Sequence, residues 1–429
     1  MGLGSPAFGI IEGFYGPPWS WAARSEVLAF GHQRGLDLYL YGPKDDPLHR
    51  ERWREPYPTD ELDGFAGLVA DDTMRVGFAI SPGLSIDVGS AEDRRALGAK
   101  VDQVVGVGIS TVALLLDDIP VRPGLGPEHA ELTAWLHDHL AGRASLILVP
   151  TEYAGTDPSA YLDALVAGVP DDVPIGWTGR RVVVDEITVA EAQARAAALG
   201  GRAPFVWDNY PVNDGLMADR LFLGPLRGRE PGLVDVCSGY VANPMVQPRA
   251  STLPLASMAA WVRGGDPLEA WRDTAAELGW LVLAQACDGA HPAELVDQAL
   301  AGLEAGQTDV LDRLGEWLHD ARHLEAPGLE DEAGPWLDQT RAEARLGGAA
   351  VRLLRRRAED RDAAIGEDAI GVAAWWQAQR RSALTVMGPR CSIRPILFND
   401  DHGEWQWDPA SVEVDDNAID RLVRAALGL

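Results

Sequence analysis

Two adjacent aspartates, Asp117 and Asp118, end an apolar run in the string TVALLLDD at residues 111–118. Hydrolysis of a glycosidic bond needs a proton donor at the leaving oxygen and a group that stabilises the sugar cation. Most retaining enzymes supply both with two carboxyl groups about 5–5.5 Å apart. Neighbours along a strand point to opposite faces, but where a strand turns into its loop the second side chain can swing back. A purely structural role, as a helix N-cap or a solvated turn, is equally compatible with LLLDD alone.

A neighbouring pair of carboxyl groups suits a reaction in which the 2-acetamido oxygen of the substrate is the nucleophile. One carboxylate accepts the acetamido N–H and stabilises the developing oxazolinium. The other works as general acid and then as base for the incoming water. Two like charges so close together also push their pKa values apart, which favours one ionised and one protonated role.

Asp185 and Glu186 form a rival pair in the string VVVDEIT, which also follows an apolar run. A helical stretch begins directly afterwards, at Thr188. Acidic residues at the start of a helix interact favourably with its free N–H groups. We therefore interpret this pair as structural.

The elements that would position the first pair are short, β-rich apolar runs alternating with helical stretches up to about residue 262. Alternation of this kind predicts a parallel sheet, and eight units in roughly 250 residues predict a closed (β/α)8 barrel of the α/β class. An open, doubly wound sheet stays an alternative, although no GxGxxG follows the first run. The eight runs are residues 8–16, 36–44, 75–82, 111–118, 145–153, 173–179, 203–210 and 233–244.

Polar and aromatic residues gather where these runs end. In a parallel barrel the carboxyl ends of all strands meet at one face, where active sites lie. The sequence thus predicts one functional rim, contributed by Glu12, Tyr15, Lys44 to Asp46, Asp117, Asp118, Glu152, Tyr153, Thr178, Asn209, Asp214 and Asn243.

After residue 262 the strands give way to helical periodicity. The segments expected to be helical are 266–286, 291–304, 307–324, 333–358 and 367–386. The chain therefore divides into a catalytic barrel (1–262), a helical bundle (263–387) and a tail of unknown role (388–429), which ends in an amphipathic helix. Self-association through the bundle or the tail is an expectation.

Composition narrows the partners of this 429-residue chain. A net charge of −28 argues against nucleic acid and anionic membranes. Three scattered cysteines, Cys237, Cys287 and Cys391, indicate a reducing compartment. The absence of a leader or an apolar run long enough to cross a bilayer also favours a cytoplasmic protein. His319 and His323 have a spacing that can bind metal, but without a third ligand nearby no metal or cofactor is expected.

Several strings along residues 8–262 resemble glycoside hydrolase family 84, which contains the bacterial and animal O-GlcNAcases, and they occur in that family's order and spacing. They are IEGFYGPPW, YLYGPKDDPLHRERWRE, LLLDDIP, VPTEY, IGWTG, VVVDEIT, WDNYPVND and GYVANPMVQ. The helical region resembles the family's bundle more weakly. Val149 replaces a small residue that some members carry before PTEY, which would tighten the pocket floor.

The resemblance implies a role for each matching residue. Asp117 would orient and polarise the acetamido group, and Asp118 would be the general acid/base. Tyr153 would donate a hydrogen bond to the acetamido oxygen, supported by Asn209. The remaining residues would shape the acetamido pocket (Tyr15, Thr178 and Trp207) or grip the sugar's hydroxyls (Asp214, Lys44, Asn243 and Gly13).

The expected activity is that of a metal-free, exo-acting, retaining β-N-acetylglucosaminidase on a GlcNAc-bearing glycoside or glycoprotein. One alternative is an endo-acting, hyaluronidase-type glycosaminoglycan hydrolase, which the acidic charge disfavours. Another is a non-catalytic GlcNAc-binding module, which would not need the acid at Asp118.

Overall fold

The computed structural model describes residues 6–359, 366–382, 384–388, 397–399, 405–407 and 415–429, and Cys391 lies outside them. The chain separates into two compact units. The first comprises residues 1–215, 226–267 and 395–408, and the second comprises residues 216–225, 268–394 and 409–429. The three-part division at residues 262 and 387 stays a proposal.

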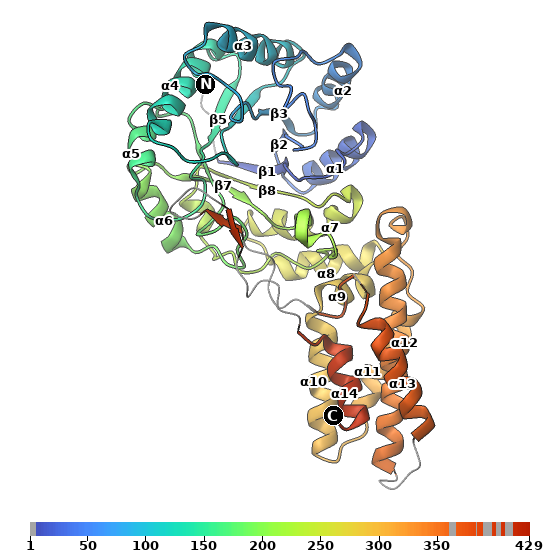
Figure 1. Ribbon diagram of the computed structural model, residues 1–429. Helices are drawn as coiled ribbons and strands as arrows, with labels where there is room; N and C mark the ends of the chain where they lie inside the picture. The colour runs from blue at the N-terminus through green and yellow to red at the C-terminus, as the bar shows by residue number, and fades with distance from the viewer. Residues whose placement is uncertain (1–5, 360–365, 383, 389–396, 400–404, 408–414) are drawn as a thin grey trace. The chain divides into compact units, whose positions relative to one another are not determined.

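Eight parallel strands form a closed barrel in chain order, because β8 pairs with β1 as well as with β7 (Figure 1). The predicted (β/α)8 barrel is confirmed, and an open sheet is excluded. The strands are shorter than the apolar runs, because the runs extend into the neighbouring loops, and the run at 233–244 begins with a 3-10 turn at Leu233–Asp235 before the strand starts. Their bounds are β1 Ala7–Glu12, β2 Leu38–Tyr41, β3 Arg75–Ile80, β4 Thr111–Leu115, β5 Ser145–Val149, β6 Ile175–Trp177, β7 Pro204–Asp208 and β8 Gly239–Ala242.

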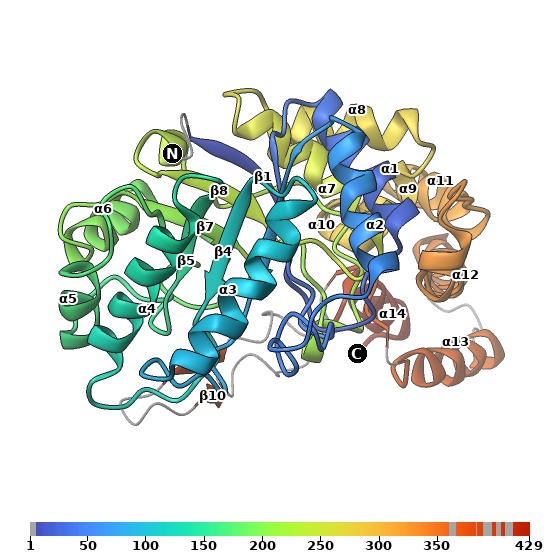
Figure 2. The same ribbon diagram turned by 90° about the horizontal axis from the view of Figure 1, so that it is seen from above.

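Helices alternate with the strands, and Figure 2 shows α3 to α6 along the outer side of the barrel. The expected helix start after VVVDEIT is confirmed: Thr188 and Glu191 form a capping box at the start of α6. These helices are α1 Trp21–Gln33, α2 Thr59–Ala70, α3 Ala91–Gly106, α4 Leu125–Leu140, α5 Ala160–Val166, α6 Val189–Ala198 and α7 Pro248–Trp261, with short 3-10 turns at Gly215–Met217 and Leu233–Asp235.

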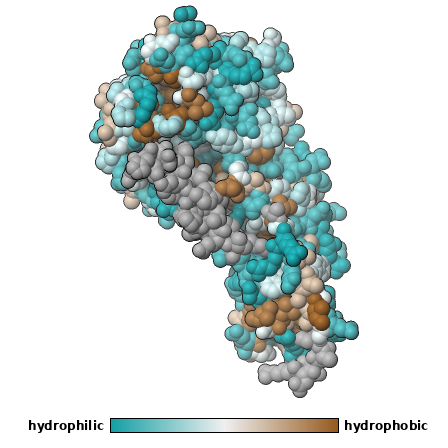
Figure 3. All heavy atoms as spheres, viewed as in Figure 1, coloured by the Kyte–Doolittle hydropathy of each residue, from teal (hydrophilic) through white to brown (hydrophobic). Residues whose placement is uncertain are grey.

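Apolar side chains from alternating positions of the strands fill the barrel. At its upper end this core includes Val149, Tyr153 and Trp207, with Val182 packed beside them. The floor of the rim is therefore continuous with the barrel core, so the aromatic residues there are held by packing. On the face seen in Figure 3 the described surface is mainly hydrophilic, with small apolar patches.

The second unit is built of helices. The segment expected to be helical over residues 266–286 contains two helices, because Gly279 adopts a left-handed backbone (φ 73°) that ends the first helix. The helices are α8 Pro267–Glu277, α9 Leu281–Asp288, α10 Ala290–Glu304, α11 Val310–Arg322, α12 Glu330–Glu359, α13 Gly366–Gln379 and α14 Ala418–Leu427. Within the described residues, no helix combines the length and apolarity needed to cross a bilayer.

The expected C-terminal amphipathic helix is confirmed as α14, which packs against α10, α12 and α13. Trp376 of α13 donates a hydrogen bond to Asp420 of α14 at 2.6 Å. Two short strands, β9 Leu397–Asn399 and β10 Trp405–Trp407, pair antiparallel earlier in the tail. The other tail residues, 389–396, 400–404 and 408–414, lie outside the described residues.

Glu12, one of the polar residues at the strand ends, is fully buried and joins β1 to α1. Its carboxylate accepts two hydrogen bonds from Arg24, at 2.8 and 2.9 Å, and one from the backbone N–H of Trp19 at 3.0 Å. The hydroxyl of Tyr39 also donates to it. With its hydrogen-bonding capacity used inside the wall, Glu12 is structural.

Arg24→Met should therefore destabilise the barrel, because it leaves Glu12 charged and buried without its partner. Breaking a buried ion pair in this way costs about 3–5 kcal/mol. The urea midpoint of unfolding should fall accordingly. Arg249→Met is the matched control, because Arg249 pairs with Glu26 on the surface, where both side chains are about half exposed. Similar midpoints for the two variants would contradict the structural role.

Candidate active site

The two aspartates follow β4, whose last residue is Leu115. Asp118 adopts a left-handed backbone with φ 55°, a conformation that Asp tolerates better than most residues. This turn brings its side chain back to the rim beside that of Asp117. Both carboxylates consequently reach the same ammonium: Nζ of Lys44 lies 2.6 Å from Oδ2 of Asp117 and 3.7 Å from Oδ2 of Asp118.

Lys44 reaches the pair from the loop after β2, where its backbone N–H donates to the carbonyl of Phe14 at 3.0 Å. Its side chain is buried. Burial alone lowers its pKa, but the charges of Asp117 and Asp118 raise the pKa of Lys44 above the ordinary value, so the ammonium stays charged. A compact ammonium can thus interact with both carboxylates, and its single positive charge offsets part of their mutual repulsion.

Two tyrosines donate to Asp118 from opposite sides. The Tyr153 hydroxyl lies 3.0 Å from Oδ1, and the Tyr15 hydroxyl lies 2.9 Å from Oδ2. Asp117 is satisfied on one side only: Lys44 binds Oδ2, while the buried Oδ1 has no hydrogen-bond partner among the described residues. Asp117 therefore presents one free acceptor.

The two carboxyl groups have oppositely shifted pKa values. Burial raises the pKa of Asp117 and outweighs the lowering by Lys44. Burial would also raise the pKa of Asp118, but Lys44 and the hydroxyls of Tyr15 and Tyr153 bring it below its usual range. The split expected for neighbouring carboxyl groups is thus present. In this structure, however, the group that retains its proton to higher pH is Asp117.

The amide side chains of Asn209 and Asn243 form a chain of hydrogen bonds along the rim. Oδ1 of Asn209 accepts from Nε1 of Trp207 and from Nδ2 of Asn243, both at 3.0 Å. Oδ1 of Asn243 in turn accepts from the backbone N–H of Gly13 at 3.2 Å. These bonds fix the Trp207 ring at the rim, and Nζ of Lys44 lies 5.9 Å from its centroid.

Asp214 and Thr178 flank this arrangement. Oδ2 of Asp214 accepts from the backbone N–H of Tyr15 at 2.7 Å. Burial, together with the nearby charge of Asp118, raises the pKa of Asp214. Thr178 bonds to backbone instead: its N–H donates to the carbonyl of Tyr153 at 3.0 Å and its hydroxyl to that of Arg181 at 3.1 Å. It therefore supports the segment that carries Tyr153.

Other polar residues at the strand ends form hydrogen bonds that stabilise the loops. Glu152 accepts from the hydroxyl of Ser159, the N-cap residue of α5. Asp46 accepts from the hydroxyls of Tyr41 and Tyr57 at 2.8 and 2.5 Å. The rival carboxylates at residues 185–186 are exposed. The structure thus separates site residues from loop-fixing residues that share the same position at strand ends.

Arg50 was not singled out in the sequence, yet its guanidinium donates to the Tyr15 hydroxyl at 2.6 Å. Three arginines occur in the segment PLHRERWRE, at positions 50, 52 and 54. No spacing rule distinguishes them in a loop. Only the fold shows that Arg52 pairs with Glu55 on the surface and Arg54 with Asp93, while Arg50 faces the site.

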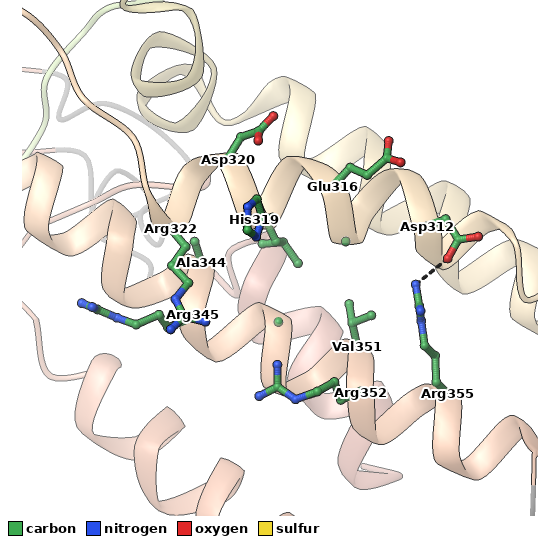
Figure 4. Close-up of a pocket in the computed structure, with 13 residues that line it drawn as sticks. Asp312, Glu316, His319, Asp320, Arg322, Ala344, Arg345, Val351, Arg352 and Arg355 are labelled. Atoms are coloured by element: carbon green, nitrogen blue, oxygen red, sulfur yellow. Dashed lines mark hydrogen bonds and ion pairs between the residues drawn. The ribbon is translucent and has the colours of Figure 1, made fainter.

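A separate hollow of about 690 Å³ lies in the helical unit, between α11 and α12 (Figure 4). One edge carries acidic residues and the other arginines, with an ion pair of 2.5 Å between Asp312 and Arg355. His319 lines this hollow, and the carbonyl of His319 meets Nδ1 of His323 at 2.9 Å. Among the described residues, no three His, Cys, Asp or Glu side chains are grouped so as to hold a metal.

A closed barrel with two carboxyl groups, a buried ammonium and aromatic walls at its carboxyl-terminal rim has the components of a glycoside hydrolase site. Residues 8–286 match the profile of the beta-N-acetylglucosaminidase family. The chain belongs to this family, whose members are glycoside hydrolases, and the resemblance to glycoside hydrolase family 84 is confirmed.

Curated relatives include the protein O-GlcNAcases of Rattus norvegicus and Mus musculus. Each is 33% identical over 273 residues, which covers 59% of this chain and 30% of the relative. The chain thus matches less than a third of the length of these proteins. A solved structure of a variant O-GlcNAc hydrolase from Thermobaculum terrenum has the same fold, with a TM-score of 0.80, 24% identity, and coverage of 99% of this chain and 94% of that chain.

Gly13→Ala tests how tightly the rim is packed. A Cβ at this position would lie 2.4 Å from Cζ2 of Trp207, so the indole would have to move. Overpacking of this kind typically costs about 1–3 kcal/mol, and we expect a lower melting temperature and a changed tryptophan fluorescence spectrum. Gly67→Ala in α2, where an added Cβ meets nothing within 4 Å, is the control. An unchanged spectrum in Gly13→Ala would show that Trp207 is not tightly packed against position 13.

Proposed function

We propose that this protein is a retaining, exo-acting β-N-acetylglucosaminidase that works by substrate-assisted catalysis through an oxazoline intermediate. The observation that carries this proposal is the buried Oδ1 of Asp117, which has no hydrogen-bond partner in the described part of the chain. A buried acceptor without a partner is costly. The N–H of a 2-acetamido group bound at this position would satisfy it, and a plain hydroxyl sugar offers no amide there.

In the first step, the acetamido oxygen attacks the anomeric carbon while the bond to the leaving oxygen breaks. Asp117 accepts the hydrogen bond of the acetamido N–H and stabilises the positive charge that develops on the ring being formed. Asp118 gives its proton to the leaving oxygen. In the second step, Asp118 takes a proton from water, whose oxygen opens the oxazoline at the anomeric carbon and restores the acetamido group with retained configuration.

The proton of the pair must then lie on Asp118 in the complex, although Asp117 holds it more strongly in this structure. Substrate binding supplies the shift. The acetamido N–H stabilises the ionised form of Asp117, and Tyr153 exchanges its bond to Asp118 for one to the acetamido oxygen. Having lost a donor, Asp118 binds the proton more tightly.

The substrate class follows from the residues around the pair. Asp214, Asn243 and the backbone of Gly13 would hold the outer hydroxyls of a terminal sugar, which favours exo action. We propose a terminal β-linked GlcNAc on a glycoside or glycoprotein as the substrate. Sparse cysteines, of which Cys237 and Cys287 are free thiols, support a cytoplasmic location. Self-association stays a prediction.

Leaving-group dependence tests the two roles. Asp118→Asn should keep much of its activity on aryl glycosides with good leaving groups, which need little protonation, and lose about 10²–10⁴-fold on poor ones, the usual contribution of a general acid. Asp117→Asn should lose activity on both kinds. Asp185→Asn, an exposed carboxylate outside the site, is the control. Equal losses for both site variants across leaving groups would overturn the assignment.

The nucleophile is tested by changing the substrate. Wild-type protein should hydrolyse aryl β-GlcNAc, be at least about 10³-fold slower on the aryl β-glucoside, which lacks the intramolecular nucleophile, and slow progressively as fluorine is added to the N-acetyl group. Proton NMR should show the β-anomer formed first. Rates insensitive to fluorination would exclude acetamido participation. Depolymerisation of hyaluronan would favour the endo-acting alternative, and binding without turnover the non-catalytic one.

A further inference from the structure

Arg50 is linked to the proposed acid/base through a single phenol. Its NH1 group lies 2.6 Å from the Tyr15 hydroxyl, which lies 2.9 Å from Oδ2 of Asp118. A guanidinium can only donate hydrogen bonds. The Tyr15 oxygen must therefore accept from Arg50, and the one proton that it carries is left for Asp118.

We propose that Arg50 is a positioning residue for the acid/base step, which acts through Tyr15 to direct the phenol proton at Asp118. This inference rests on the proposed function of Asp118. When Asp118 gives its proton to the leaving oxygen, the carboxylate that forms finds a donor already aimed at it. Preorganised donors of this kind stabilise a developing charge without reorganisation during the reaction.

The two residues just before Arg50 in the chain, Leu48 and His49, hold its loop against the barrel. Nδ1 of His49 meets the carbonyl of Ala79 at 2.6 Å, and burial lowers the pKa of His49 to about 3, so the neutral ring donates this bond. Nζ of the buried Lys100 donates to the carbonyl of Leu48 at 3.0 Å. The guanidinium of Arg50 thus extends from an immobilised backbone, which distinguishes it from an ordinary surface arginine.

Tyr15 needs such a partner because its ring is at the mouth of the site. It is 45% exposed, although the residue's backbone N–H is held by Asp214 at 2.7 Å. Nothing in the packing of a half-exposed ring fixes where its hydroxyl proton points. The bond from Arg50, whose guanidinium also lies 5.5 Å from the ring centroid, supplies that constraint.

Arg50 also acts on the proton balance of the pair. Its positive charge lowers the pKa of both Asp117 and Asp118. Removing that charge raises both, so the pair keeps its last proton to higher pH. Because the acid step needs one proton on the pair, the alkaline limb of the kcat/KM–pH profile should move to higher pH. The charged and titratable groups that face Asp118 are Lys44, Asp117, Tyr15, Tyr153, Asp214 and Arg50.

The test is a double-mutant cycle between Arg50→Gln and Tyr15→Phe, with kcat/KM measured against pH on aryl β-GlcNAc substrates. On poor leaving groups we expect Arg50→Gln to lose about tenfold, the size of one charge-assisted hydrogen bond, with a smaller loss on good leaving groups and an alkaline limb at higher pH. Arg50→Lys should keep the limb close to wild type, because the charge remains, but recover only part of the rate.

In the Tyr15→Phe background, Arg50→Gln should change the rate on the plateau below the alkaline limb less than about twofold, because the phenol through which Arg50 acts is gone. The shift of the limb itself should remain, since it comes from the charge of Arg50. Arg52→Gln, which removes an arginine two positions away that pairs with Glu55 on the surface, should behave like wild type. Additive losses in the double variant, or an unmoved limb with equal losses on all leaving groups, would overturn the proposal. A loss confined to peptide substrates would instead place Arg50 on the aglycone and also overturn it.

A second measurement separates this inference from the proposed function. If wild-type protein fails to hydrolyse aryl β-GlcNAc, the proposed function fails. The proton balance is then measured without turnover, by NMR of protein labelled with ¹³C at the aspartate carboxyl carbons. The Asp118 signal, assigned by its loss in Asp118→Asn, should titrate at higher pH in Arg50→Gln than in wild type. An unchanged titration would refute the positioning role even in an active enzyme.

Discussion

The buried ammonium of Lys44 is the interaction on which the site depends. Two ionised carboxylates from consecutive residues repel each other and lose hydration when they share one pocket, and a nearby positive charge offsets part of both costs. Lys44 lies 2.6 and 3.7 Å from the two carboxylates, and both of their charges keep it protonated. The loop after β2 therefore has to be rigid, and the bonds around Asp46 and Lys100 make it so.

The barrel supplies the rest of the geometry by extending its core to the rim. Tyr153 and Trp207 belong to the same packed cluster as the strand interiors, so the groups that border the aspartates are held by close packing. Polar groups then finish the wall: the indole of Trp207 and the amide of Asn243 converge on one oxygen of Asn209. A rigid wall of this kind can hold a small group such as an acetamido methyl without reorganising.

Sequence patterns predicted the parallel barrel and the aspartate pair, because buried strands and their polar ends have a plain periodicity. They could not separate Glu12 and Glu152, which brace helices, from Asp117 and Asp118, since all lie at strand ends. They predicted helical structure over residues 266–286 but not the break at Gly279, whose left-handed backbone divides the segment into two helices. Arg50 was not predicted as a site residue, because it lies in a loop, where no periodicity marks functional positions. Only the fold shows that it contacts Tyr15.

The uneven hydrogen bonding of the two aspartates gives the proposed specificity a physical basis. Asp118 accepts from two tyrosine hydroxyls and Lys44 donates to Oδ2 of Asp117, whereas Oδ1 of Asp117 lacks a partner among the described residues. Under the proposed function, a sugar with an amide N–H at this point would satisfy this acceptor, while a sugar without one would leave it unsatisfied and gain little from binding. The same N–H would stabilise Asp117 in its ionised form. Binding of the acetamido group and transfer of the proton to Asp118 would then occur together. A sugar that lacks the acetamido group would therefore not place the proton on Asp118.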